Sequence, residues 1–147
     1  MSRPPRPPAA PAAPAAANAP LPRTLRRRMR WLVYVPENTA LCRRVARVLR
    51  GRGRLSEAER YLRRSLNLRP DDAPLLLELA RCFAATDRVS AASAVVESLA
   101  GRPDLAPGRR REAAELCERL EMRRDAEAVH RQMVRDALAL EAENAGA

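Results

Sequence analysis

One apolar pattern occurs three times along this chain at a nearly constant spacing, and it constrains the fold more than any other feature. Its first copy is Cys42, Val45, Ala46 and Leu49, which are spaced i, i+3, i+4 and i+7. This spacing places the four side chains on one face of a helix. Later copies begin 34 and then a further 37 residues on, at Leu76, Leu79, Ala80, Phe83 and at Ala113, Leu116, Cys117, Leu120. Such a period indicates a helical repeat.

A second apolar helix face follows each copy, so each repeat is predicted to be an antiparallel helical hairpin. The second faces are Ala58, Leu62, Leu66; Ala92, Val96, Leu99; and Val129, Met133, Ala137. Three hairpins are expected within residues 37–142, in repeats of about 39–72, 73–106 and 107–140, with residues 143–147 frayed. Aromatic residues make up only 3% of the chain, which agrees because Leu, Val and Ala suit packed helices better than sheets.

Residues that start helices and form turns stand where the repeat requires them. Asn38-Thr39 and Asp71-Asp72 precede the first helices of two repeats and are able to cap them. Gly53 supplies a permissive backbone for the first hairpin turn, and Asp87-Arg88 occupies the corresponding turn of the second repeat. Ser56, with a glutamate three residues later, has the spacing of a capping box for the second helix.

Residues 1–36 have a different composition and are predicted to be a disordered tail rich in Pro, Ala and Arg. Residues 1–22 are almost entirely Pro and Ala, which block helix and bury little area. Their Pro-Pro-Arg-Pro-Pro motif is either a spacer or a ligand for an aromatic-lined groove. The apolar run at 31–35 is far shorter than the ~20 residues that cross a bilayer. No transmembrane segment is therefore expected.

Charge is concentrated in the N-terminal half. All 28 basic residues are arginine, and residues 1–72 hold 17 of them against five acids. Two interpretations of the end of the tail remain open. In one, residues 31–35 pack on the first hairpin and the arginines are solvated. In the other, a basic cluster binds an acidic partner, a nucleic-acid backbone or an anionic membrane surface. That cluster comprises Arg26, Arg27, Arg28, Arg30 and Trp31.

The repeat resembles the tetratricopeptide repeat family. The resemblance rests on small residues in both helices, a glycine in the turn, an aromatic residue and a closing proline. The first repeat matches at Ala46, Gly53, Ala58 and Pro70, and the second at Ala80, Phe83, Ala92 and Pro103. The early Trp of the family is absent, and Val129 replaces a small residue in the third repeat. The resemblance implies an all-α fold, a right-handed α-solenoid of about three antiparallel hairpins behind the tail.

The resemblance also implies a concave groove, formed by the first helix of each hairpin, that binds a partner segment. The groove residues implied are Arg43, Arg47, Arg50, Leu77, Arg81 and Arg111. Arginine-rich lining suits a peptide or helix of acidic character. The family's carboxylate clamp also requires Asn at groove positions, and none stands there. The alternative is that Arg43, Arg47 and Arg50 form a solvated face, paired with Glu57 or Glu59.

The chain lacks the residue patterns of an enzyme. His130 is the only histidine and has no nucleophile at a motif-like spacing, and there is no phosphate-binding glycine loop. Cys42, Cys82 and Cys117 are far apart and match neither a zinc site nor a disulfide framework, which favours a reducing, cytoplasmic compartment. No catalytic residue, cofactor or metal is predicted.

The sequence is compatible with two functions. The first is a non-catalytic adaptor or scaffold that binds a protein partner in the groove. The alternative is a nucleic-acid-associated or anionic-surface-binding protein that acts through the arginine-rich half. A homo-oligomer or larger assembly is also compatible, because a short repeat array exposes apolar ends.

Overall fold

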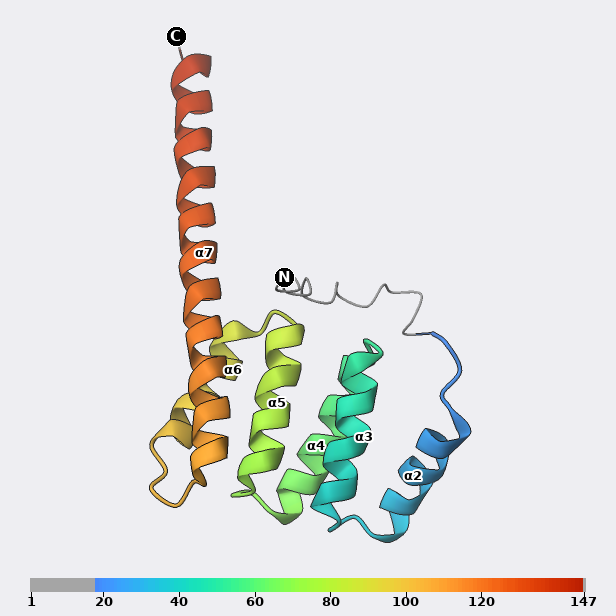
Figure 1. The fold of residues 1–147 in the computed structure, drawn as a ribbon. Helices are drawn as coiled ribbons and strands as arrows, with labels where there is room; N and C mark the ends of the chain where they lie inside the picture. The colour runs from blue at the N-terminus through green and yellow to red at the C-terminus, as the bar shows by residue number, and fades with distance from the viewer. Residues whose placement is uncertain (1–17, 147) are drawn as a thin grey trace, which may run out of the picture. The chain divides into compact units, whose positions relative to one another are not determined.

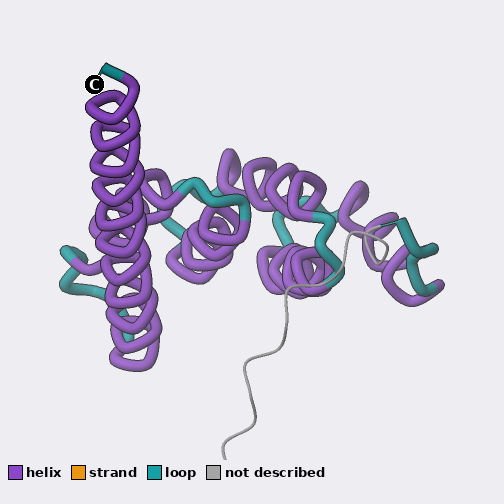
Figure 2. The backbone as a smooth tube through the Cα atoms, turned by 90° about the horizontal axis from the view of Figure 1, so that it is seen from above, coloured by secondary structure: helices purple, strands orange, loops and turns teal. Residues whose placement is uncertain are grey.

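The computed structural model describes residues 18–146, which contain helices and connecting turns and no strand (Figures 1 and 2). The helices are α2 (Arg23–Tyr34), α3 (Thr39–Gly51), α4 (Leu55–Leu68), α5 (Ala73–Ala85), α6 (Val89–Ala100) and α7 (Pro107–Ala145). The chain divides into two compact units, and the boundary between Glu78 and Leu79 lies inside α5. The predicted all-α fold with a helical repeat is confirmed.

In the first unit, α3 and α4 form a hairpin and α2 packs against α3 (Figure 1). The core includes the four apolar residues predicted for α3, the two α4 residues Ala58 and Leu62, and Leu25 and Leu32 of α2. Leu25 and Leu32 are seven residues apart, so they lie on the same face of α2 after two helical turns. The first-repeat hairpin predicted from periodicity is therefore formed with its predicted core, except that Leu66 is only half-buried and Ser65 is buried beside it.

The end of the predicted disordered tail is instead a helix. Pro22 precedes the first residue of α2, and arginine, leucine and methionine, which favour helix, follow. Pro36 then lies just beyond the end of the helix, where its missing N–H removes no helical bond. The prediction of disorder was wrong here because it extended the Pro/Ala character of the preceding segment across Pro22. The Pro-Pro-Arg-Pro-Pro motif lies outside the described residues.

Caps and turns recur at equivalent positions of the first and second repeats. The Asn38 Oδ1 accepts from the Leu41 N–H at 3.0 Å, and the Asp72 Oδ1 accepts from the Leu75 N–H at 3.1 Å. In the turns, Gly53 and Asp87 both have positive φ, 76° and 59° respectively. The next residue, Arg54 or Arg88, donates its N–H to the carbonyl five residues earlier, which belongs to the last buried residue of the preceding helix. Asp87 thus performs the conformational role of the turn glycine, as predicted.

The capping box predicted at Ser56 is not formed. Helix α4 already begins at Leu55, and Arg54 precedes it without a side-chain cap. The Glu59 carboxylate instead accepts from the Arg63 Nε at 2.8 Å, one turn further along α4. The earlier start follows from the tight turn at Gly53, which returns the chain to helical geometry before Ser56 is reached.

In the second unit, α6 packs against α7, and α7 continues far beyond the end of α6 (Figure 1). The predicted third hairpin is not formed, because α7 is one helix of 39 residues. Residues 121–128 contain neither Gly nor Pro, so nothing in that segment interrupts the helix. Val129 and Met133, predicted to be a second core face, are exposed. The predicted fraying from residue 143 is also wrong, since α7 reaches Ala145.

Candidate functional site

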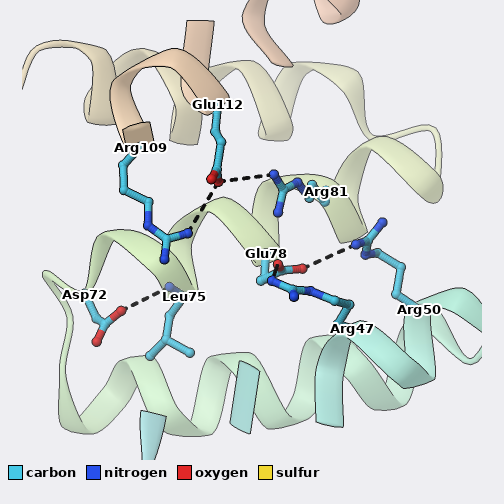
Figure 3. Close-up of polar contacts among 8 residues, drawn as sticks. All are labelled: Arg47, Arg50, Asp72, Leu75, Glu78, Arg81, Arg109 and Glu112. Carbon is cyan, nitrogen blue, oxygen red and sulfur yellow. Dashed lines mark hydrogen bonds and ion pairs between the residues drawn. The ribbon is translucent and has the colours of Figure 1, made fainter. Parts of the chain in front are cut away.

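Three arginines on one face of α3 form the most ordered cationic cluster of the first unit. Arg43, Arg47 and Arg50 are spaced at four and three residues, so they stand one above another on the helix, and we call them the arginine ladder. The Arg47 Nη2 donates to the Glu78 Oε1 at 3.0 Å, and the Arg50 Nη2 lies 3.4 Å from the Glu78 Oε2 (Figure 3). Glu78 belongs to α5, and its carboxylate contacts two of the three arginines of the ladder.

Burial explains why Glu78 has this arrangement. Its side chain is 2% exposed, and an isolated carboxylate at that depth would lose its hydration without compensation. Two guanidinium groups replace the lost water. Each guanidinium carries five N–H donors, of which Glu78 engages only part, and the Arg47 side chain remains 57% exposed. Three arginines against one carboxylate leave the ladder with an excess of positive charge.

The alternative partners suggested by the sequence are not the ones used. Glu57 pairs with Arg54, the residue before α4, and Glu59 pairs with Arg63 within α4. Arg43 forms no ion pair within residues 18–146. Sequence proximity suggested Glu57 and Glu59, whereas the observed partner Glu78 lies 31 residues from Arg47 and is reached only through the fold.

In the second unit, Glu112 of α7 receives two arginines. The Arg81 Nη2 of α5 and the Arg109 Nη1 of α7 each lie 3.4 Å from the Glu112 Oε2 (Figure 3). Arg111 is exposed and has no ion pair among the residues that the structure describes. The predicted groove residue Leu77 is fully buried and is not a surface residue. Helix α5 is apolar on almost every side, which is typical of a helix enclosed by its neighbours, and this accounts for the error.

Helix α2 presents the most exposed cationic surface. At helical spacing, one face of α2 carries four arginines and two aromatic residues, which line a hollow of about 950 Å³. This basic α2 face comprises Arg23, Arg26, Arg27, Arg30, Trp31 and Tyr34. Trp31 and Tyr34 are 52% and 74% exposed, and none of the four arginines forms an ion pair within residues 18–146. Buried Leu25 and Leu32 lie on the other side of the helix.

The basic cluster predicted from the sequence is therefore only partly one surface. Arg26, Arg27, Arg30 and Trp31 share the basic α2 face, whereas Arg28 lies about 120° further round the helix. Arg23 and Tyr34 belong to the face and were missed. Four of the arginines of residues 23–34 are spaced i, i+3, i+4 and i+7, which indicates one face of a helix and would have identified Arg23 and Tyr34 as part of it.

The titratable side chains show no arrangement of the catalytic kind within the described residues. Burial raises the pKa of the Cys42 thiol, whose Sγ donates to the Tyr61 carbonyl at 3.2 Å. Desolvation and nearby Glu121 raise the pKa of Cys117 as well, so neither thiol is activated as a nucleophile. His130 is exposed on α7. Residues 18–146 contain no cluster of His, Cys, Asp and Glu that would hold a metal ion.

Residues 49–102 match the family model of the tetratricopeptide repeat. The match runs from the end of α3 to just beyond α6 and confirms the resemblance predicted from the sequence. Tetratricopeptide repeats generally mediate protein–protein interaction. Comparison with curated proteins and with solved structures gives no match.

The match leaves both α2 and α7 entirely outside the tetratricopeptide repeat. These two helices flank the matched segment in the sequence, and they carry the most exposed charged and apolar side chains described above. Within residues 18–146, no helix has both the length and the apolar character needed to cross a bilayer.

Proposed function

We propose that this protein is a non-catalytic adaptor that binds an acidic segment of a partner protein at the arginine ladder. The observation that carries the proposal is the contact of Glu78 with Arg47 and Arg50. The buried carboxylate fixes two guanidinium groups before any partner arrives, while Arg47, whose side chain is 57% exposed, keeps N–H donors that face solvent. The tetratricopeptide-repeat match supports binding of a protein rather than a small molecule.

Preorganisation makes this arrangement effective for binding. Immobilising a long side chain at an interface costs about 0.5–1.5 kcal/mol, and part of that cost has already been met at Arg47 and Arg50 during folding. Charge-assisted hydrogen bonds between guanidinium and carboxylate contribute about 1.5–3 kcal/mol each. Arg43 has no carboxylate partner within residues 18–146 and would supply the remaining donor group. An acidic segment would thus bind Arg43, the arginine of the ladder that Glu78 does not contact.

Fluorescence anisotropy with a labelled decapeptide of alternating Glu and Leu tests the proposal on the full chain. Arg43→Glu is expected to weaken binding at least tenfold, which corresponds to the loss of about 1.4 kcal/mol. Arg60→Glu is the matched control, because it changes the same charge at an exposed position of α4 in the same unit. It is expected to weaken binding less than twofold. Equal weakening by both variants would mean that net charge alone attracts the peptide.

The nucleic-acid alternative would act through a different surface, the basic α2 face. Its exposed Trp31 and Tyr34 offer stacking platforms beside the four arginines. A labelled single-stranded oligonucleotide in the same anisotropy assay separates the two functions. Binding that weakens with Arg30→Glu but not with Arg43→Glu, and that decreases steeply with salt, would favour this alternative.

A further inference from the structure

The distal part of α7 carries an apolar stripe with no partner among the described residues. The stripe comprises Met122, Ala126, Val129, Met133, Ala137 and Leu140. Its members follow one another in steps of four, three, four, four and three, so they lie along a straight line on a helix of 3.6 residues per turn. Met133, near the centre, is 64% exposed. A continuous exposed stripe of this kind marks an interaction surface.

The stripe is distinct from the face of α7 that packs in the second unit. That packing face is formed by Ala113, Leu116 and Leu120. At 3.6 residues per turn, the stripe lies about 130° round the helix from it. The stripe therefore faces away from the packed side of α7, and no side chain of its own unit is placed to cover it.

One edge of the stripe is acidic. The acidic edge comprises Glu118, Asp125, Asp136 and Glu143. None of these four carboxylates forms an ion pair within residues 18–146, and Asp136 accepts only the Gln132 Nε2, at 2.8 Å. A partner for this surface therefore needs a row of cations beside an apolar or aromatic surface.

The basic α2 face has those properties, and every copy of the chain carries it. Arg23 and Arg30 are seven residues apart, as are Asp136 and Glu143, which is about 10.5 Å along each helix. Two helices lying side by side can therefore form both ion pairs at once. Trp31, on the same face as the arginines, would then lie over the apolar stripe near Met133, where sulfur–aromatic contacts are favourable.

Electrostatic repulsion disfavours contacts in which the same helix of two copies pairs with itself. Two α2 helices would oppose arginine to arginine. Two antiparallel α7 stripes would bring their acidic edges together. In a parallel α7 pair, the acidic edge would meet an edge whose Arg123 is already bonded to Ala84 and Asp87, which leaves Arg119 as the one arginine there against four carboxylates. Pairing α2 with α7 instead places two arginines of α2 opposite two carboxylates of the acidic edge.

We propose that the basic α2 face of one molecule docks on the apolar stripe of α7 of a second copy. The helices lie antiparallel, with Arg30 opposite Asp136 and Arg23 opposite Glu143. This orientation also places the N-terminus of α2 beside the C-terminus of α7, where the helix dipoles attract. The contact joins two different surfaces, so it closes into a reciprocal dimer or continues into a chain of molecules.

Sedimentation velocity of the full chain between 1 and 100 µM, after nuclease treatment, tests the contact. The average mass is expected to rise with concentration, and Arg30→Glu or Asp136→Arg alone should weaken association at least tenfold. The double variant Arg30→Glu/Asp136→Arg should restore it, because the ion pair is rebuilt with its charges exchanged. Arg28→Glu is the matched control, since it makes the same change on another side of α2.

Several results would overturn this contact. A monomer at every concentration, association that disappears with nuclease, or an equal effect of Arg28→Glu would each do so. Failure of the exchanged pair to restore association would also count against it, provided that the exchange at Arg23 and Glu143 fails too. Circular dichroism of each variant checks that the total helix content is unchanged. Peptide binding at the arginine ladder is measured separately, so the two proposals succeed or fail independently.

Discussion

Replacing Glu78 by Gln should destabilise the first unit by about 2 kcal/mol. Removing one partner of a buried ion pair costs about 3–5 kcal/mol when the remaining charge stays buried. The cost is smaller here because Arg47 is largely exposed and regains water, and because the amide oxygen still accepts a hydrogen bond. For a chain of this size the melting temperature should decrease by about 6 °C. Thermal unfolding followed by circular dichroism measures the change.

The stability losses of related variants test whether burial of the Glu78 carboxylate sets the size of the effect. Arg47→Gln should cost less than about 1 kcal/mol, since Glu78 keeps Arg50 and the lost group was half in solvent. Glu57→Gln, which breaks a more exposed pair with Arg54, is the control and should cost about 0.5 kcal/mol. If Arg47→Gln and Glu78→Gln were equally costly, burial of the carboxylate would not be the controlling factor.

A double-mutant cycle isolates the interaction itself. Arg47→Gln and Glu78→Gln should be non-additive by about 1 kcal/mol, because each removes the same 3.0 Å contact. Replacing Arg47, Arg50 and Glu78 together by leucine should recover most of the stability lost in Glu78→Gln, since apolar packing often substitutes for a buried ion pair. Additive single effects would refute the view that the two side chains stabilise each other.

Four further outcomes follow from local geometry. Gly53→Ala should cost about 1–2 kcal/mol in thermal unfolding because its φ is positive, whereas Gly51→Ala, with open space at its Cβ, should be neutral or stabilising. Arg123→Gln should increase hydrogen exchange in the turn between α5 and α6, since its guanidinium donates to that turn. Burial raises the pKa of the Cys42 thiol in the folded protein, so the stability that the protonated thiol contributes is complete below the pKa of the unfolded state and is lost as the pH rises through the pKa of the folded state. Cys42→Ala should therefore flatten the decrease in melting temperature between about pH 8 and pH 10. Removing residues 133–147, which are exposed throughout 133–146, should change the melting temperature measured at 1 µM by less than about 2 °C.

The parts of the fold that the sequence predicts well are those set by local rules. Val45 and Leu49 are buried because their spacing puts them on one helix face, and Asn38 caps α3 because its short side chain reaches the N–H three residues on. Gly53 and Asp87 tolerate the positive φ that both turns require. These features depend on a few neighbouring residues, so one sequence is sufficient to identify them.

The predictions that were wrong concern segments where two local rules compete, or contacts between residues that are far apart in the sequence. Val129 and Met133 have the spacing of a buried face, but with no break before them the helix continues and leaves them exposed. Glu78 was not anticipated as the partner of the ladder because 31 residues separate it from Arg47. Leu77 shows the same limit, since periodicity suggests which residues share a face and not which faces neighbouring helices will cover.

The recurrence of caps and turns at the same positions of successive repeats gives the chain a unit of length. Asn38 and Asp72 both begin a helix by the same side-chain contact, so a copy of residues 39–72 inserted after Asp72 would end in an aspartate already able to cap α5. The converse deletion, of residues 38–71, would bring Asp72 to the position that Asn38 now holds after α2. Within these two repeats, an insertion or deletion that is not a whole interval from Asn38 to Asp72 would separate α3 or α5 from the side chain that caps it.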